Sequence, residues 1–324
     1  MPITTLVYRE SRFVAHNPPP ESLATLRTEP GVMLWVDLSA PTEEEIKLVL
    51  ETTFQFHPLA IEDCVADSPF PKLEDFDTYL YLVMHAVDYT KTAHFTTTEL
   101  DLFLGKTFIV TFHRQPLKPV QAALERYLKS PGTPVRGPDR FAHGILDLMV
   151  EAYKPALDEL QHELDALEAD LLRTLPADQL FPRILALRKE LSSLRQIVRP
   201  QREIVAELAQ GKTKLIRSLM VPYLRDLVDD LLRIETQAGA WADQVILSFR
   251  VYLNKTSHEA NEGIRLLTAI TALTIPVLLV GAWYGMNYEH MPELPSVFGY
   301  PLAAFLTLGG TIAMLWVMKK KKWL

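Results

Sequence analysis

Cysteine is almost absent from this chain of 324 residues, since Cys64 is the only one. An internal disulfide is therefore impossible, and most of the chain is expected to lie in a reducing compartment. An excess of basic charge is also missing, because 33 Lys and Arg stand against 40 Asp and Glu, a net charge of −7. Nucleic-acid binders usually carry a basic excess, so no nucleic-acid partner is expected and a cation suits the chain better.

The sequence also lacks the short motifs of common enzyme classes. It has no Gly-rich nucleotide loop, paired-cysteine motif, HExxH zinc motif or nucleophile elbow. Its nine histidines are scattered, which argues against a dedicated transition-metal site. The N-terminus does not have the basic segment and long apolar run of a signal peptide. We therefore expect neither an enzyme nor an organic cofactor.

Charged side chains disappear almost completely in the C-terminal part. Residues 266–288 form a run of 23 without Asp, Glu, Lys, Arg or His, and residues 294–318 form a run of 25. The hydrocarbon core of a bilayer takes about 20 helical residues, so each run is long enough to span it. Membrane helices tolerate a proline such as Pro276, and Gly309 and Gly310 fit close helix packing. A buried hairpin in a large soluble core is the alternative, although two such runs in tandem are rare there.

Basic residues predict the orientation of the two spans. The outer flanks of the two runs carry Arg250, Lys255 and Arg265 on one side and the four lysines of the basic tail 319–324 on the other. The loop 285–297 has Glu289 and Glu293 but no Lys or Arg. The positive-inside rule therefore places both termini in the cytoplasm and the acidic loop outside, in a multi-pass protein of the cell membrane.

The first part of the chain, residues 1–135, mixes strand and helix patterns and predicts a cytoplasmic α/β domain with helices around a mixed sheet. Segments rich in Val, Leu, Phe, Tyr and Thr predict strands at 3–8, 33–38, 79–87 and 100–112. Thr42, followed by three glutamates and apolar residues, predicts a capped helix start, and Pro58 predicts a short helix over 59–65.

Long helices are predicted from residue 140 onward. Leucines recur at helical spacing over 140–173, and Pro182 opens a second helical segment to about Leu208, which together predict a cytoplasmic helical hairpin over 136–221. A third helix begins near Pro222. If it continues to Tyr284 it has 63 residues and a length of about 95 Å. This stalk helix, 222–284, would continue into the first transmembrane span, and a second transmembrane helix is expected at 298–318.

Two membrane helices cannot enclose a water-filled path, so conduction would need one helix from each of several subunits. Residues of the first span that recur in steps of three and four share one helix face and form a candidate pore lining, although ordinary core packing produces the same periodicity. They are Asn261, Ile264, Leu267, Thr271, Ile275, Leu278 and Ala282. Neither span contains an ionisable side chain, which favours passive flow. An apolar constriction at Leu267, Ile275 and Leu278 could gate that flow by dewetting.

The first span ends in Tyr284-Gly285-Met286-Asn287, followed by Met-Pro-Glu-Leu at 291–294, the second span and the lysine-rich tail. In this context the Gly-Met-Asn triplet resembles the CorA family of magnesium channels. Further similarity to the family lies at 57–63, 71–74 and 223–226. The resemblance covers most of the chain, more loosely in residues 1–50.

This resemblance implies a funnel-shaped homopentamer with a cytoplasmic α/β domain, a long pore-lining stalk helix and an outer second helix in the lipid bilayer. Gly285, Met286 and Asn287 would form the selectivity filter, and Glu289 and Glu293 would concentrate cations at the outer mouth. Mg²⁺ sheds water reluctantly, so a ring of neutral amide oxygens can accept hydrogen bonds from its hydration shell without stripping it. A helix C-cap is the alternative role of Asn287.

The resemblance also implies regulatory divalent-cation sites between subunits. The matching residues are Asp63, with Glu62 beside it, Asp226 and Asp165. Bare carboxylates of neighbouring subunits repel one another and bound Mg²⁺ bridges them, so Mg²⁺ would be both the transported ion and the ligand that closes the pore. For each of these acids alone, the alternative is a solvated helix face.

Relatives often carry a hydroxyl residue at the position of Leu278 and methionine at that of Ile275, so this chain departs from them below Asn287. The sequence favours a channel for passive influx of Mg²⁺, and also of Co²⁺ and Ni²⁺. Two alternatives stay open: a zinc transporter similar to ZntB, driven by a proton gradient, and a membrane-anchored scaffold or sensor without ion flux.

Overall fold

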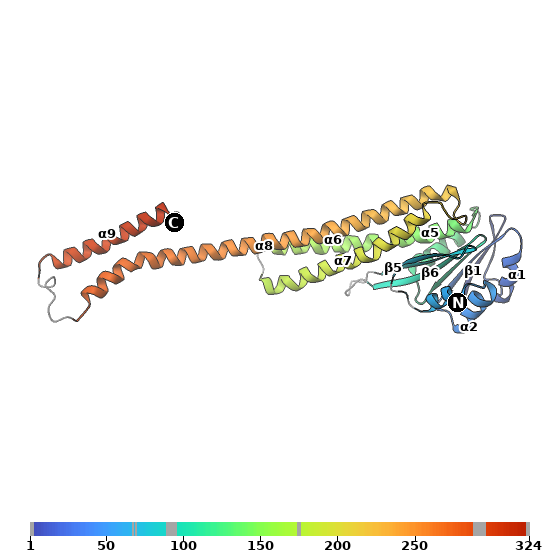
Figure 1. Cartoon of the computed structure of the whole chain (residues 1–324), viewed down its shortest axis with the longest axis horizontal. Helices are drawn as coiled ribbons and strands as arrows, with labels where there is room; N and C mark the ends of the chain where they lie inside the picture. The colour runs from blue at the N-terminus through green and yellow to red at the C-terminus, as the bar shows by residue number, and fades with distance from the viewer. Residues whose placement is uncertain are drawn as a thin grey trace. The chain divides into compact units, whose positions relative to one another are not determined.

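The computed structural model describes residues 3–66, 68, 70–88, 96–173, 176–287 and 296–321 (Figure 1). The chain divides into two compact units, residues 1–247 and residues 248–324. The division falls within helix α8 (Val221–Tyr284), which therefore contributes to both units.

A seven-stranded sheet forms the centre of the first unit, in the order β2-β1-β3-β7-β6-β5-β4. Its strands are β1 (Ile3–Arg9), β2 (Arg12–His16), β3 (Val32–Ser39), β4 (Lys72–Asp75), β5 (Tyr79–Asp88), β6 (Thr96–Gly105) and β7 (Phe108–His113). β3 and β7 pair in parallel, and the other neighbours are antiparallel. The sheet is mixed, as predicted, and its central strands are nearly continuous apolar runs because helices cover both faces.

The strands predicted at 3–8, 33–38 and 79–87 are confirmed by β1, β3 and β5. The single strand predicted over 100–112 is wrong, because this segment is a hairpin of β6 and β7 in which Leu104 faces Ile109. Gly105 and the polar pair Lys106–Thr107 interrupt the apolar run. A glycine followed by polar residues indicates a turn, and the prediction of a single strand did not take this into account.

Short helices cover one face of the sheet. They are α1 (Leu23–Thr28), α2 (Glu43–Ile46), its π-helical continuation η2 (Lys47–Thr53) and α3 (Pro58–Val65), preceded by the single turn η1 (Pro20–Ser22). The predicted cap is confirmed, since Thr42 and Glu45 form a reciprocal capping box. Aromatic rings fill the layer beneath these helices: the ring centroid of Phe56 lies 4.1 Å from that of Phe103 and 5.8 Å from that of Phe108.

Two further helices, α4 (Lys118–Lys129) and α5 (Pro138–Glu151), cover the opposite face (Figure 1). Helix α5 contacts β3, β5, β6 and β7. The ring of Phe141 on α5 lies 5.2 Å from that of Tyr8 and 5.5 Å from that of Trp35, between centroids. The predicted α/β domain, with helices around a mixed sheet, is confirmed.

The remaining helices of this unit are α6 (Tyr153–Leu172), α7 (Ala177–Leu208) and the first part of α8, which follows the short turn η3 (Ser218–Met220). The single helix predicted over 140–173 is wrong. It is divided at Ala152 because Pro155 has no N–H to bond the carbonyl of Glu151, where α5 ends. The second helix begins before Pro182 rather than at it, since its first turns bury Leu180 completely. The long helix predicted to Tyr284 is confirmed at 64 residues.

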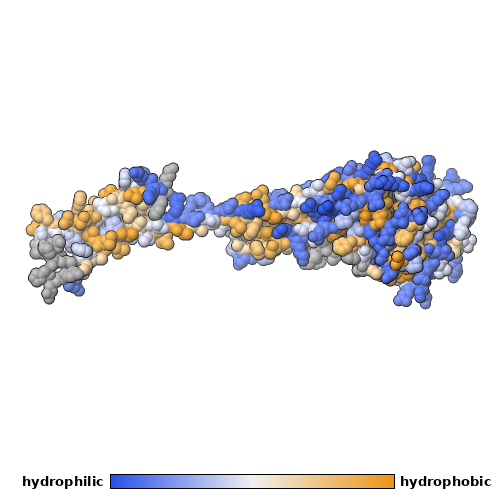
Figure 2. Space-filling model, viewed as in Figure 1, coloured by the Kyte–Doolittle hydropathy of each residue, from blue (hydrophilic) through white to orange (hydrophobic). Residues whose placement is uncertain are grey.

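The second unit consists of the C-terminal part of α8 and helix α9 (Gly299–Lys320). Both helices are long and apolar enough to cross a bilayer, as predicted. Hydrophobic side chains dominate the surface of this unit (Figure 2), which is typical of a surface that meets lipid or another protein. Within the two apolar runs the shielded residues are mostly small: Ala269, Ala272, Leu273, Pro276, Val280 and Tyr284 on α8, and Gly299, Ala303, Thr307, Gly310, Thr311, Met314 and Met318 on α9.

Gly310 marks a close approach of α9 to α8. A Cβ atom at Gly310 would lie 3.0 Å from the Cβ of Pro276, whereas a Cβ at Gly309 would meet nothing within 4 Å. We expect Gly310→Val to lower the melting temperature in detergent by several degrees, because overpacking costs about 1–3 kcal/mol. Gly309→Val is the matched control, since it adds the same side chain on an open side. Equal melting temperatures of the two variants would contradict this packing.

Candidate functional site

The stripe predicted to line a pore lies on an open side of α8. Leu267 and Leu278 are each 66% exposed and Ile275 is 41% exposed. With about 3.6 residues per turn, the centre of this stripe falls opposite the positions that α9 shields, such as Ala269 and Pro276. Helix α9 therefore leaves the whole stripe exposed in the single chain.

Hydroxyl groups on this side of α8 donate to the helix itself. Thr271 Oγ1 donates to the carbonyl of Leu267 at 2.9 Å, and Thr274 Oγ1 donates to the carbonyl of Thr271 at 2.8 Å. Because each hydroxyl proton is used within the helix, the oxygen can offer only lone pairs to its surroundings. Such oxygens can accept hydrogen bonds from the water shell of a cation.

Helix α8 ends directly before the Gly-Met-Asn triplet. Gly285 N–H donates to the carbonyl of Gly281 at 2.9 Å, and Met286 N–H to that of Trp283 at 3.4 Å. A Cβ at Gly285 would lie 2.8 Å from the Gly281 oxygen, so this turn requires glycine. Asn287 follows as an exposed residue.

Asparagine caps a helix C-terminus by adopting the left-handed backbone conformation. Asn287 is not among the described residues with a positive φ, which gives no support to its alternative role as a C-cap. The predicted outer-mouth residues Glu289 and Glu293 lie outside the described residues.

The four acids predicted to bind a regulatory cation lie on three different helices of the first unit. Glu62 and Asp63 are on α3, Asp165 is on α6 and Asp226 is on the first part of α8. Glu62, Asp165 and Asp226 are exposed, and Asp63 is half-buried. Over the described ranges, no three His, Cys, Asp or Glu side chains lie close enough to hold a metal ion. One chain by itself therefore does not assemble the predicted set.

Asp226 sits where α8 packs on α5. The ring of Tyr223 lies 5.6 Å from that of His143, between centroids, and the Arg140 guanidinium lies 5.3 Å from the Tyr223 ring. Burial lowers the pKa of His143, although the nearby carboxylates of Asp147 and Asp226 act in the opposite direction. The backbone around Asp226 is thus held by packing while its carboxylate stays open to solvent.

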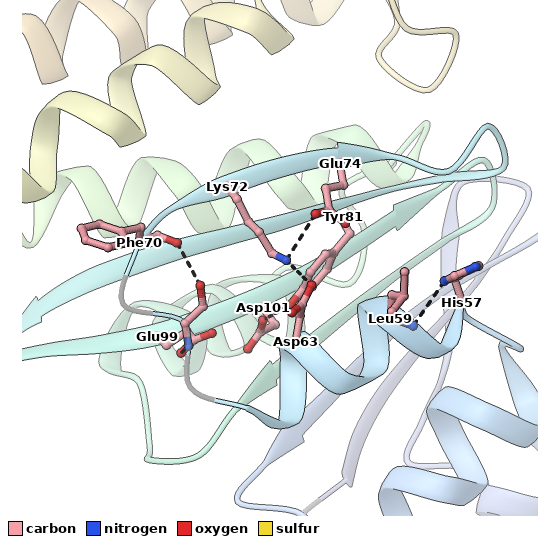
Figure 3. A network of polar contacts seen from close by, with 10 residues as sticks. His57, Leu59, Asp63, Phe70, Lys72, Glu74, Tyr81, Glu99 and Asp101 are labelled. Atoms are coloured by element: carbon pink, nitrogen blue, oxygen red, sulfur yellow. Dashed lines mark hydrogen bonds and ion pairs between the residues drawn. The ribbon is translucent and has the colours of Figure 1, made fainter.

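Asp63 has a cationic neighbour, Lys72 on β4 (Figure 3). Lys72 Nζ donates to Asp63 Oδ2 and lies 3.4 Å from Glu74 Oε1 and 5.0 Å from the centre of the Tyr81 ring. Burial on its own lowers the pKa of Lys72, but the contacts with Asp63 and Glu74 outweigh it and leave the pKa above its usual value. Lys72 therefore stays a cation at the carboxylate predicted to bind Mg²⁺.

The buried carboxyl group of Asp101 fixes the position of Tyr81, whose ring contacts Lys72. Tyr81 O–H donates to Asp101 Oδ1 at 2.6 Å, and Asp101 is only 1% exposed. Burial raises the pKa of Asp101 well above its usual value, and it raises that of Cys64, beside Asp63 on α3, in the same way. Tyr81 therefore contacts Asp101 through its hydroxyl group and Lys72 through its ring.

The sequence interpretation missed the role of Lys72 and Tyr81. Lys72 lies within the family-like segment 71–74, but nothing in its local sequence pattern points to Asp63. The available signal was a lone lysine beside Glu74 in a short strand, which becomes informative only when strand β4 is placed next to α3.

A mixed α/β domain and two helices long and apolar enough to cross a membrane, of which the first has 64 residues and ends at the Gly-Met-Asn triplet, are the features expected of a two-span membrane protein with a large domain outside the membrane. The profile of the CorA-like Mg²⁺ transporter protein family matches residues 30–320. The cobalt/magnesium transport protein CorA of Thermotoga maritima is 30% identical over 294 residues, which cover 90% of this chain and 83% of that protein.

Solved structures share the fold. The complete CorA magnesium transporter from Methanocaldococcus jannaschii superposes with a TM-score of 0.79 at 17% identity and covers 99% of this chain and 98% of its own. The cytoplasmic domain of ZntB from Vibrio parahaemolyticus superposes with a TM-score of 0.58 at 13% identity, over 81% of this chain and 100% of its own. The chain belongs to the CorA-like Mg²⁺ transporter family, as its resemblance indicated, and it is a transporter rather than an enzyme.

Proposed function

We propose that this protein is a channel for passive influx of Mg²⁺, and also of Co²⁺ and Ni²⁺, across the cell membrane. It acts as a homopentamer with both termini in the cytoplasm. The observation that carries the proposal is the open stripe of α8, which lies opposite the side shielded by α9 and contains no ionisable side chain. Five such stripes around one axis line a path, while α9 takes the outer, lipid-facing position.

The lining suits a cation that keeps its water shell. Thr271 presents oxygen lone pairs, and Leu267, Ile275 and Leu278 form apolar rings that empty of water when the pore narrows. At the outer end, Gly285 and Met286 place Asn287, whose amide oxygens accept hydrogen bonds from hydrated Mg²⁺. Glu289 and Glu293 raise the local cation concentration beyond this filter.

Regulation rests on acids that one chain leaves apart. In a pentamer, Asp63, with Glu62, of one subunit meets Asp226 of the next, and Asp165 belongs to the same acidic surface. Mg²⁺ bound between them draws the cytoplasmic domains together and closes the pore. Low internal Mg²⁺ leaves the carboxylates to repel one another, which opens it.

Uptake into proteoliposomes, with membrane potential and pH gradient imposed independently, tests the proposal. We expect Mg²⁺ uptake to follow a negative-inside potential and to ignore the pH gradient, because the described parts of both spans contain no proton-carrying side chain. Uptake that needs a proton gradient would favour the zinc carrier similar to ZntB. The absence of any metal uptake would favour the scaffold or sensor.

A further inference from the structure

We propose that Lys72 is a built-in competitor of the regulatory divalent cation at Asp63, and that it sets the Mg²⁺ concentration at which the protein closes. This inference rests on the proposed regulatory function of Asp63. The Lys72 ammonium contacts Asp63 Oδ2 directly, so one of the two carboxylate oxygens that could bind a metal ion or its water is already paired with a cation.

The structure keeps the ammonium at this place. Lys72 and Glu74 belong to strand β4, which pairs with β5 so that Glu74 faces Tyr81. Glu74 Oε1 and the Tyr81 ring hold Lys72 Nζ from two further sides, and the Lys72 side chain is only 25% exposed. Because the Lys72 ammonium belongs to the same chain as Asp63, its effective concentration at that carboxylate is high. This concentration does not depend on the salt concentration of the solution.

The carboxylate itself stays accessible. The Asp63 side chain is 43% exposed, so a cation can approach from the side that Lys72 leaves open. A divalent cation must then either displace the ammonium or bind beside a like charge, and both weaken binding. Competition for the Asp63 carboxylate therefore raises the Mg²⁺ concentration at which the protein closes.

The test is a Mg²⁺ titration of protease protection on the full-length protein in detergent. We expect Lys72→Met, which keeps the apolar stem against Tyr81 but removes the charge, to lower the half-protecting Mg²⁺ concentration about two- to fivefold, the usual worth of a partly exposed ion pair. Lys72→Arg keeps the charge and should stay near the wild-type midpoint. Lys129→Met removes an equal charge from an exposed pair with Glu125 and should not move the midpoint.

The midpoint is the decisive quantity, because a purely structural role of Lys72 would change the rate of cleavage without Mg²⁺ and leave the midpoint in place. A midpoint of Lys72→Met at or above the wild-type value would overturn the inference. If that happens while Asp63→Ala with Asp226→Ala abolishes protection, only the competitor role fails. If the double variant keeps full protection, the sensor itself fails, and the role of Lys72 with it.

Lys72→Gln is the second variant, with a polar tip in place of the charge, and its midpoint should also fall. Failure of both uncharged variants to fold would contradict the proposal, since Lys72 would then be required for packing.

Discussion

Asn287→Ala is expected to reduce Mg²⁺ uptake by proteoliposomes to the level of protein-free vesicles, while the oligomer stays intact. The proposed filter offers hydrated Mg²⁺ a ring of amide oxygens, and alanine removes all of them at once because every subunit carries the change. A cation whose water is costly to remove then has no acceptor that can hold its shell at the mouth. Fluorescence of a Mg²⁺ indicator inside the vesicles measures the effect.

Asn254→Ala provides the matched control. It removes the same amide from an exposed position within helix α8, outside the proposed pore stripe and outside the Gly-Met-Asn turn. Uptake should stay at the wild-type level, and both variants should elute at the wild-type oligomer size. If Asn287→Ala transported Mg²⁺ like the wild type, the filter would have to lie elsewhere, and Thr271 would become the next candidate.

Local patterns in the sequence predict much of this fold. The capping box at Thr42 and the long helix that ends at Tyr284 depend on neighbours within a few residues, so their prediction succeeds. The errors arise where one residue outweighs a long pattern. Gly105 turns the predicted strand into a hairpin, and Pro155 divides the predicted helix at Ala152.

The candidate site is predictable only in part, because its decisive contacts are not local. Periodicity places Leu267, Ile275 and Leu278 on one face of α8. The sequence of α9 is apolar all round, so it does not indicate which face of α8 this helix covers. The contact of Gly310 with Pro276 settles that question. The ion pair of Lys72 and Asp63 depends in the same way on where strand β4 lies relative to helix α3, which no sequence window contains.

The second large effect is expected for Asp63→Ala combined with Asp226→Ala. Mg²⁺ should strongly slow trypsin cleavage of the first unit, residues 1–247, in the wild-type protein and should not protect the double variant at all. The described residues of one chain form no metal-binding group of three, so the proposed site depends on carboxylates of two subunits. The double variant lacks the Asp63 carboxylate of one subunit and the Asp226 carboxylate of its neighbour, so neither can bind Mg²⁺ in the proposed site.

A matched variant, Glu125→Ala with Glu151→Ala, removes the same charge from exposed ion pairs of the same unit and should keep Mg²⁺ protection. Protection of the Asp63 and Asp226 variant at the wild-type Mg²⁺ concentration would exclude these residues from the sensor.

Weak individual sites suffice for this regulation. A ligand that binds only one state stabilises it by about 1.4 kcal/mol per site at ten times its dissociation constant. Five equivalent interfaces would together contribute roughly 7 kcal/mol, enough to change a mostly open population into a mostly closed one. The double variant should therefore also conduct at internal Mg²⁺ concentrations that silence the wild type, and uptake into vesicles preloaded with Mg²⁺ measures this. A variant that loses protection but still closes would separate the protease-resistant state from the gate.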